Sequence, residues 1–246
     1  MIIQMIRTDT IANNLANVDT TGFKQDLSVF RTNNPMAIHR VDDQTLPTPA
    51  GPVDPKPFIG FMPNGALWER NYIDFSQGSL RLTGNPLDVA ITGPDFLAVN
   101  TPNGIQYTRD GALRRNANGA LVDVNGYGVL NTQNKPIVLG DGPITISEDG
   151  QISVGGEVAD QLQRVTLPQN LAIQKVGDNF YQYAGPVGPP RGTVEQGFLE
   201  GSNANAILEM VRLIEAERAY QTSSRALASE DTALQSAVTD VGRSTR

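Results

Sequence analysis

The chain has 246 residues, of which 39% are hydrophobic, and its 26 acidic and 19 basic residues give a formal net charge of -7. The length is enough for one large or two modest domains, and the hydrophobic content is adequate for a core, so a wholly disordered chain is excluded. The acidic balance disfavours nucleic acid as a partner, and the lack of cysteine excludes disulfides, thiolate metal sites and cysteine nucleophiles.

The N-terminal segment is predicted to be a helix. Residues 1–17 contain neither Gly nor Pro, and Ile11, Leu15 and Val18 have the i, i+4, i+7 spacing of one apolar stripe. Gly22 follows and can take the left-handed conformation that closes helices. The apolar start lacks a basic leading region and a cleavage site, so it does not resemble a secretory signal. No apolar run reaches the ~20 residues that a transmembrane helix needs, so no transmembrane segment is expected.

Three asparagines lie close together on this predicted helix. Asn13, Asn14 and Asn17 are poor helix formers, because their amides compete for backbone hydrogen bonds. We expect them to make hydrogen bonds between helices or between subunits, and a solvated polar face is the alternative. In the first case, replacing them with Ala should raise the helicity of the isolated segment but weaken assembly.

Residues 31–71 are predicted to form an extended linker or arm. Prolines remove backbone donors and disfavour both helices and central strands. Within this segment they are Pro35, Pro47, Pro49, Pro52, Pro55, Pro57 and Pro63. The single histidine, His39, lies here, so a Ser-His-Asp triad would have to take its base from this arm. No catalytic residue is predicted.

Residues 72–184 are predicted to form one all-β domain of short strands. The dipeptides Asn103-Gly104, Asp110-Gly111, Asn118-Gly119, Asn125-Gly126, Asp141-Gly142 and Asp149-Gly150 suit tight turns. Between them lie segments rich in strand formers: 87–91, where apolar and polar residues alternate, then 96–99, 105–108, 121–124, 144–147, 162–167 and 180–183. Residues 116–119 and 123–126 superficially suggest calcium loops, but both lack the EF-hand glutamate, so hairpin turns are expected and no metal or cofactor is predicted.

A connector at 185–202 is predicted to lead into a C-terminal helix at 203–246. Ser202 or Asn203 can cap it, and no Gly or Pro follows until Gly242. Ala206, Leu213, Tyr220, Leu227, Leu234 and Val241 recur every seven residues, and the small residues Ala216, Ser223 and Ala237 lie at a second register. Glu209 and Glu230 also fall at that second register and make it less regular. This spacing predicts a coiled-coil seam.

The predicted fold class is therefore α+β. Residues 1–30 and 203–246 would form a coiled-coil-like shaft domain, and the all-β domain lies between them in sequence. The residues predicted to form an assembly interface are Ile11, Asn13, Asn14, Leu15, Asn17, Val18, Leu213, Tyr220, Leu227 and Leu234.

Residues 11–24, with the sequence IANNLANVDTTGFK, resemble the N-terminal signature shared by flagellar rod and hook proteins. Three further stretches agree in order: GNPLDVAI at 84–91, YTRDG at 107–111 and GFLEGSNAN at 197–205. Residues 210–220 are similar to the family's C-terminal helix. The single compact β domain is most like a rod protein.

This resemblance implies a structural subunit of the bacterial flagellar basal body rather than an enzyme. It implies export through the flagellar type III apparatus without a cleaved signal, and helical polymerisation with copies of itself and with other rod or hook subunits. Compared with the family, the chain lacks roughly three turns of helix before the Asn-rich motif, about 16 Å. The alternatives are a hook-like axial protein, a secreted β-domain adhesin or glycan-binding module, and, more remotely, a hydrolase.

Overall fold

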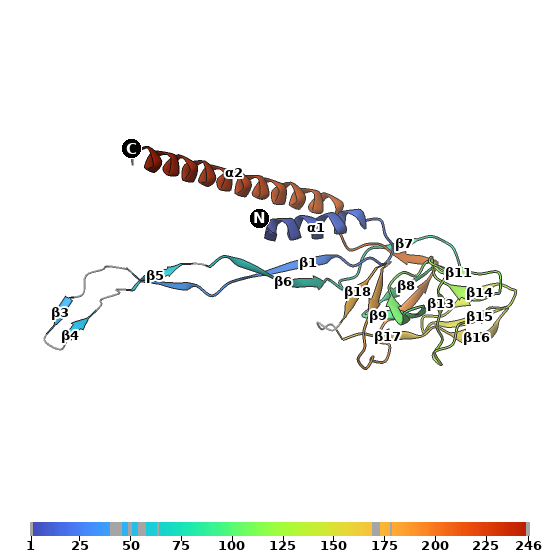
Figure 1. Ribbon diagram of the computed structural model, residues 1–246. Helices are drawn as coiled ribbons and strands as arrows, with labels where there is room; N and C mark the ends of the chain where they lie inside the picture. Colours follow the sequence, from blue (N-terminus) through green and yellow to red (C-terminus); the bar gives the residue numbers. More distant parts are fainter. Residues whose placement is uncertain are drawn as a thin grey trace. The chain divides into compact units, whose positions relative to one another are not determined.

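The structure is a computed structural model that describes residues 2–39, 46–48, 51–53, 58–62, 64–168, 173–177 and 179–244. The chain divides into two compact units. One consists of Thr8–Leu27 and Ile73–Arg218, and the other of Met1–Arg7, Ser28–Tyr72 and Ala219–Arg246. A helix near each end of the chain and a mostly β region between them confirm the α+β class (Figure 1).

The two helices are α1 (Ile2–Ala16) and α2 (Ala206–Ser244). Asn205 caps α2: its side-chain oxygen accepts hydrogen bonds from the N–H groups of Ile207 at 3.0 Å and Leu208 at 3.2 Å. These are the second and third helical residues, whose N–H groups have no partner within the helix. The expectation that Ser202 or Asn203 caps this helix is therefore wrong.

The largest sheet of the first unit is antiparallel and is built around β9 (Asp95–Thr101), which pairs with β10 (Gly104–Thr108), β13 (Gly128–Val129) and β17 (Arg164–Thr166). The strand order is β11-β12-β13-β9-β10-β19-β18, with β17 off this path. The remaining strands of this sheet are β11 (Arg114–Arg115), β12 (Leu121–Val122), β18 (Gln174–Val176) and β19 (Phe180–Gln182).

Three smaller sheets complete this unit. β14 (Ile144–Ile146), β15 (Gln151–Val154) and β16 (Glu157–Gln161) form an antiparallel three-stranded sheet. β8 (Val89–Thr92) pairs with β20 (Thr193–Gln196), and β7 (Leu80–Leu82) pairs with β21 (Phe198–Glu200). The residues assigned to a connector from sequence, 185–202, thus contribute two strands, because their backbone completes the ladders that β8 and β7 begin.

The core of this unit consists of two apolar clusters. The larger one gathers aliphatic side chains from most strands, including Val89, Ile91, Leu97, Leu121, Val129, Ile137, Ile152 and Leu162. The smaller one contains Phe96, Val165, Leu167, Ile173 and Tyr181. Val89, Ala90 and Ile91 are all fully buried, so β8 lacks the alternation expected from its sequence. A strand covered on both faces has no solvent side on which polar residues would appear.

Five of the six predicted Asn-Gly and Asp-Gly turns have a glycine with positive φ, whereas Asp110-Gly111 is wrong as a turn, because no turn occurs there and Gly111 has no positive φ. The side-chain oxygen of Asn116 accepts hydrogen bonds from two N–H groups of its own turn, and Asp123 does the same with Asn125 and Tyr127. Positive φ angles occur at Gly104, Gly119, Gly126, Gly142 and Gly150. The residues that superficially suggested calcium loops therefore hold tight turns closed.

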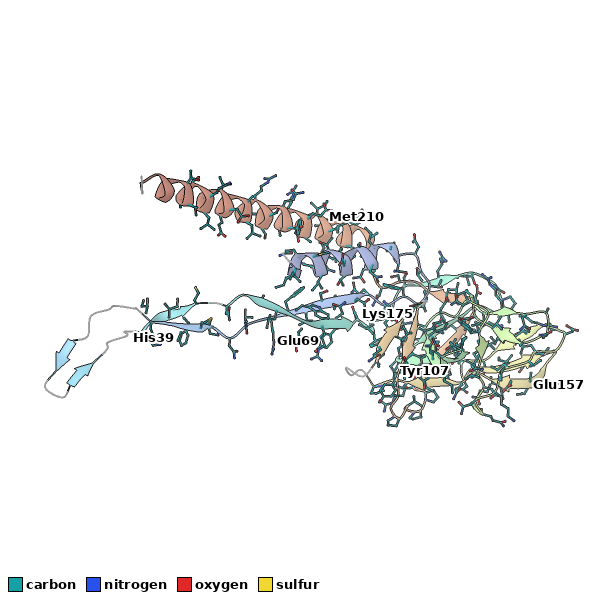
Figure 2. All side chains as sticks on the ribbon, viewed as in Figure 1. His39, Glu69, Tyr107, Glu157, Lys175 and Met210 are labelled. Atoms are coloured by element: carbon teal, nitrogen blue, oxygen red, sulfur yellow. The ribbon has the colours of Figure 1, made fainter. Side chains whose placement is uncertain are left out.

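In the second unit, the proline-rich segment forms a two-stranded ribbon (Figure 1). β1 (Asp26–Thr32) pairs with β6 (Ala66–Ile73), β2 (Met36–His39) with β5 (Phe58–Met62), and β3 (Leu46–Thr48) with β4 (Gly51–Val53). Pro47 and Pro52, which lie opposite each other in β3 and β4, fit such a ribbon because each strand has an outer edge whose N–H groups need no partner strand. Pro49, Pro55, Pro57 and Pro63 lie outside the described residues. His39, labelled in Figure 2, lies on this ribbon.

Candidate functional site: assembly surface and motif junction

The predicted seam of the C-terminal helix is largely exposed to solvent. Tyr220, Leu227 and Leu234 are 40%, 47% and 65% exposed. Nearer the start of α2, Leu213 is half-buried and Ala216 is fully buried. Of the predicted seam residues, Tyr220, Leu227 and Leu234 are therefore the large apolar side chains that are exposed enough to pack against another molecule.

The N-terminal residues predicted at the interface differ from one another in burial. Ile11 is only 5% exposed and belongs to the buried side of α1. Leu15 and Val18 are half-buried, and Asn13 is exposed. The apolar stripe of α1 is thus used at least partly for packing within the subunit.

Asn14 holds α1 onto the first residue of β1. Its side-chain amide donates to the Asp26 carbonyl at 2.9 Å, and its side-chain oxygen accepts from the Asp26 N–H at 2.8 Å. The amide thereby satisfies both backbone groups of Asp26, as a neighbouring strand would. Asn17 donates to the Asn13 carbonyl at 2.9 Å, within its own helix. Within the subunit, Asn14 and Asn17 thus bond backbone of the same chain, and hydrogen bonds between subunits stay a prediction.

The four stretches singled out in the sequence meet at a buried group of charges, Lys24, Arg109 and Glu200, here called the junction. Lys24 Nζ lies 2.6 Å from Glu200 Oε1, and Arg109 Nη1 lies 3.3 Å from Glu200 Oε2. All three side chains are at most 1% exposed. Arg109 also donates to the carbonyls of Ile91 and Gly93. Each charge comes from a different one of the recognisable stretches, and Ile91 is the last residue of the fourth.

Backbone groups strengthen the junction. The N–H of Gly22 donates to the Glu200 carbonyl at 2.7 Å, and the N–H of Gly78 donates to Glu200 Oε1 at 2.9 Å. The Thr21 hydroxyl donates to the Asp110 carboxylate at 2.7 Å. The segment after α1 is therefore bound to both the β sheet and the strand before α2.

A second amide clamp lies beside the junction. The side-chain oxygen of Asn203 accepts from the Gln25 N–H, and its amide donates to the Asp74 carbonyl, each at 2.8 Å. This role explains why Asn203 does not cap α2. Lys175, labelled in Figure 2, donates to the Lys24 carbonyl at 2.9 Å, and its Nζ lies 3.7 Å from the centroid of the Phe23 ring.

Burial shapes the electrostatics of this region. Desolvation lowers the pKa of the Lys24 amine and of the Arg109 guanidinium, while the carboxylate of Glu200 opposes both shifts. Desolvation also raises the pKa of Asp110, against the hydrogen bond from Thr21. The two cations are tolerated in the interior because a carboxylate and several carbonyls surround them.

Tyr181 gives a testable pH dependence. The side chain is fully buried, and its ring forms edge-to-face contacts with Phe75 and Phe96. Desolvation by this burial raises the pKa of the phenol. A raised pKa stabilises the folded state at pH values below the phenol's unfolded pKa of about 10, and this stabilisation is lost as the pH rises above it. We expect Tyr181→Phe to reduce the loss of unfolding free energy between pH 9 and 11 by about 1 kcal/mol.

The measurement is urea unfolding followed by circular dichroism at pH 9 and pH 11. Tyr220→Phe removes the same hydroxyl from an exposed side chain and should leave the alkaline loss unchanged. An equal alkaline loss in the unmodified chain and in Tyr181→Phe would contradict the expectation.

Lys24, Arg109 and Glu200 were not singled out as individual site residues from the sequence. The available signal was that each is a charged residue inside one of the recognisable stretches: TGFK, YTRDG and FLEGSN. Within the described part of the chain, no helix is long and apolar enough to cross a membrane. The same residues contain no group of three or more His, Cys, Asp or Glu suited to a metal ion.

Comparison with known proteins identifies three matching family descriptions. "Flagella basal body rod protein" matches residues 1–24, "Flagellar hook protein FlgE/F/G D1 domain" matches 90–154, and "Flagellar basal body rod FlgEFG protein C-terminal" matches 195–240. These ranges contain Lys24, Arg109 and Glu200, respectively.

Curated relatives align along most of the chain. The flagellar basal-body rod protein FlgG of Buchnera aphidicola subsp. Schizaphis graminum is 33% identical, over 94% of this chain and 93% of its own length. FlgG of Agrobacterium fabrum is 34% identical over 94% and 92%, and FlgF of Caulobacter vibrioides is 32% identical over 96% and 91%. With these identities across nearly the whole sequence, the chain belongs to the flagellar basal-body rod protein family that includes FlgG and FlgF.

Proposed function

We propose that this rod-family protein, which is structural rather than enzymatic, polymerises helically through its terminal helices as part of the axial drive shaft of the flagellum. Its partners are copies of itself and other rod or hook subunits, and its location is the basal body. It leaves the cytoplasm through the flagellar export apparatus without a cleaved signal. Export and location follow the family, whereas assembly is supported by a feature of this chain.

That feature is the exposed apolar seam on α2 formed by Tyr220, Leu227 and Leu234. The side chains follow one another at seven-residue intervals, so they lie on one side of a helix of 39 residues. At 1.5 Å per residue, such a helix is about 58 Å long, so the seam offers a long surface for a second helix. Apolar side chains repeated along an exposed helix gain free energy when a second helix covers them.

Assembly can be tested with Leu227→Asp combined with Leu234→Asp. Leu213 is less suitable, because it is half-buried in the subunit and its loss would also affect folding. Two carboxylates in an apolar seam must be desolvated without partners, at a cost of several kcal/mol. We expect at least a roughly tenfold fall in sedimentable polymer at equal concentration. A tenfold fall in the association constant corresponds to about 1.4 kcal/mol, which is less than the desolvation cost. Unchanged circular dichroism would show that the β domain remains folded.

Ala228→Asp combined with Ala233→Asp is the matched control. The pair adds the same two charges at exposed residues next to Leu227 and Leu234 but outside the seven-residue series, and Ala→Asp costs at least as much helix propensity as Leu→Asp. Polymer yield should stay near that of the unmodified chain, and motility of complemented cells should follow the same order. Full polymer yield from the double variant would rule out this seam as the assembly surface.

A further inference from the structure

The junction joins parts of the chain that are far apart in sequence. Glu200 bonds Lys24 across 176 residues and Arg109 across 91 residues. We propose that Glu200 acts as a latch: its carboxylate holds the segment after α1 and the segment before α2 onto the β domain, and this latch opens without unfolding of the β core.

Glu200 holds the latch closed because its carboxylate is the negative charge bonded to both buried cations. Lys24 and Arg109 are 0% and 1% exposed, and each raises the cost of burying the other because both are cations. With Glu200 present, its two carboxylate oxygens accept hydrogen bonds from both side chains. Without its negative charge, Lys24 would keep its hydrogen bond to the Ser76 carbonyl, and Arg109 would keep its carbonyl bonds and its contact with the Phe96 ring, but neither cation would be bonded to a carboxylate. Removing one member of a buried ion pair is strongly destabilising, so the Lys24 segment remains docked only while the carboxylate is in place.

The contacts of the junction also explain why the latch can open separately. Residues 21–27 and 198–203 contribute no side chain to the larger apolar cluster of the described chain. They are held mainly by hydrogen bonds, such as those from the N–H groups of Gly22 and Gly78 to Glu200. Two apolar side chains of these segments are buried, Phe23, whose ring is covered by Lys175, and Leu199. Opening the latch therefore exposes little of the apolar surface that stabilises β9 and its neighbours.

The latch can be tested without assembly, because the side chains of Lys24, Arg109 and Glu200 are at most 1% exposed and bond one another within the subunit. It also gives the recognisable stretches a role within the subunit: three of them supply the charges, and the fourth supplies the Ile91 carbonyl. The experiment consequently uses the full-length chain as a monomer, where failure of the assembly proposal would not affect the result.

The test is hydrogen exchange in Glu200→Gln, which removes the charge but preserves the shape of the side chain. We expect exchange at Gly22, Gly78 and Asn203 to accelerate by at least about 100-fold, because both cations lose their counter-charge. The Ala98 amide in β9, which bonds the Gln163 carbonyl, should change by less than about tenfold. Glu195→Gln removes a half-buried carboxylate from β20 and should leave the three junction amides unchanged.

Lys24→Met in the Glu200→Gln background removes one of the two unpaired cations. It should restore at least about tenfold of the lost protection at Gly22, because less uncompensated charge is then buried. No recovery would show that charge is not the cause. Equal acceleration at Ala98 and Gly22 in Glu200→Gln, or no acceleration at Gly22, would overturn the latch.

The unmodified chain provides a measurement that does not depend on a variant that folds. In mild denaturant, Gly22 and Gly78 should share one opening free energy that is lower than that of Ala98, because both amides bond Glu200. Exchange of all three amides only through global unfolding would contradict a separable latch.

Discussion

Gly22→Ala is expected to destabilise the subunit by about 3 kcal/mol or more. Gly22 has a φ of 65°, and a Cβ atom there would lie 2.4 Å from the Arg109 carbonyl carbon and 2.6 Å from the Asp110 nitrogen. The left-handed conformation alone costs a non-glycine residue roughly 1 to 2 kcal/mol. The overlap adds to this cost, because both neighbouring atoms are backbone and cannot move aside without disturbing the sheet.

Gly84→Ala separates the two contributions. Gly84 has a similar φ of 75°, but no atom lies within 4 Å of the position that its Cβ would take. Its replacement should therefore cost only the roughly 1 to 2 kcal/mol of the backbone conformation. Denaturant unfolding followed by circular dichroism measures both variants. Equal losses would show that the close approach of Gly22 to Arg109 is relieved without cost.

Asn14→Ala is expected to destabilise the subunit by about 1 to 3 kcal/mol, although Ala is the better helix former by about 0.5 kcal/mol. The N–H and C=O groups of Asp26 both lose their partner when the Asn14 amide is removed. Asn14 is only 2% exposed, so water does not readily take the place of its amide. The cost of unpaired backbone groups therefore exceeds the gain in helix propensity.

Asn13→Ala is the control, because Asn13 is the exposed neighbour on the same helix. Its replacement should be neutral or stabilise the subunit by up to about 0.5 kcal/mol. Unfolding of the monomer in denaturant distinguishes the two residues without any assembly assay. A loss of stability in Asn13→Ala as large as that in Asn14→Ala would show that the clamp on Asp26 is not the cause.

Local sequence signals were sufficient for the secondary structure of most of the chain. The absence of Gly and Pro predicted both helices, and the Asn-Gly and Asp-Gly dipeptides predicted turns, five of which have a glycine with positive φ. These features depend on backbone preferences of neighbouring residues, which are present in the sequence itself. The seven-residue spacing of Tyr220, Leu227 and Leu234 also belongs to the sequence, and its role in assembly remains a prediction.

Local signals failed where the partner of a residue lies far away in the chain. Asn203 is a plausible helix cap from its neighbours alone, yet its amide bonds Asp74, and Asn205 caps α2. The prolines of the arm correctly argued against helix, but they could not reveal that β1 pairs with β6, because pairing depends on a second strand.

The sequence by itself determined the α+β class, the turns of the β domain and, through its recognisable stretches, the family. Only the tertiary structure showed what those stretches do together: Lys24, Arg109 and Glu200 form one buried ionic group. A buried charge is stable only beside its partners, and those partners are brought to it by folding rather than by proximity in the chain. The need for glycine at position 22 also depends on folding, since the Arg109 backbone that lies against it comes from a distant part of the sequence.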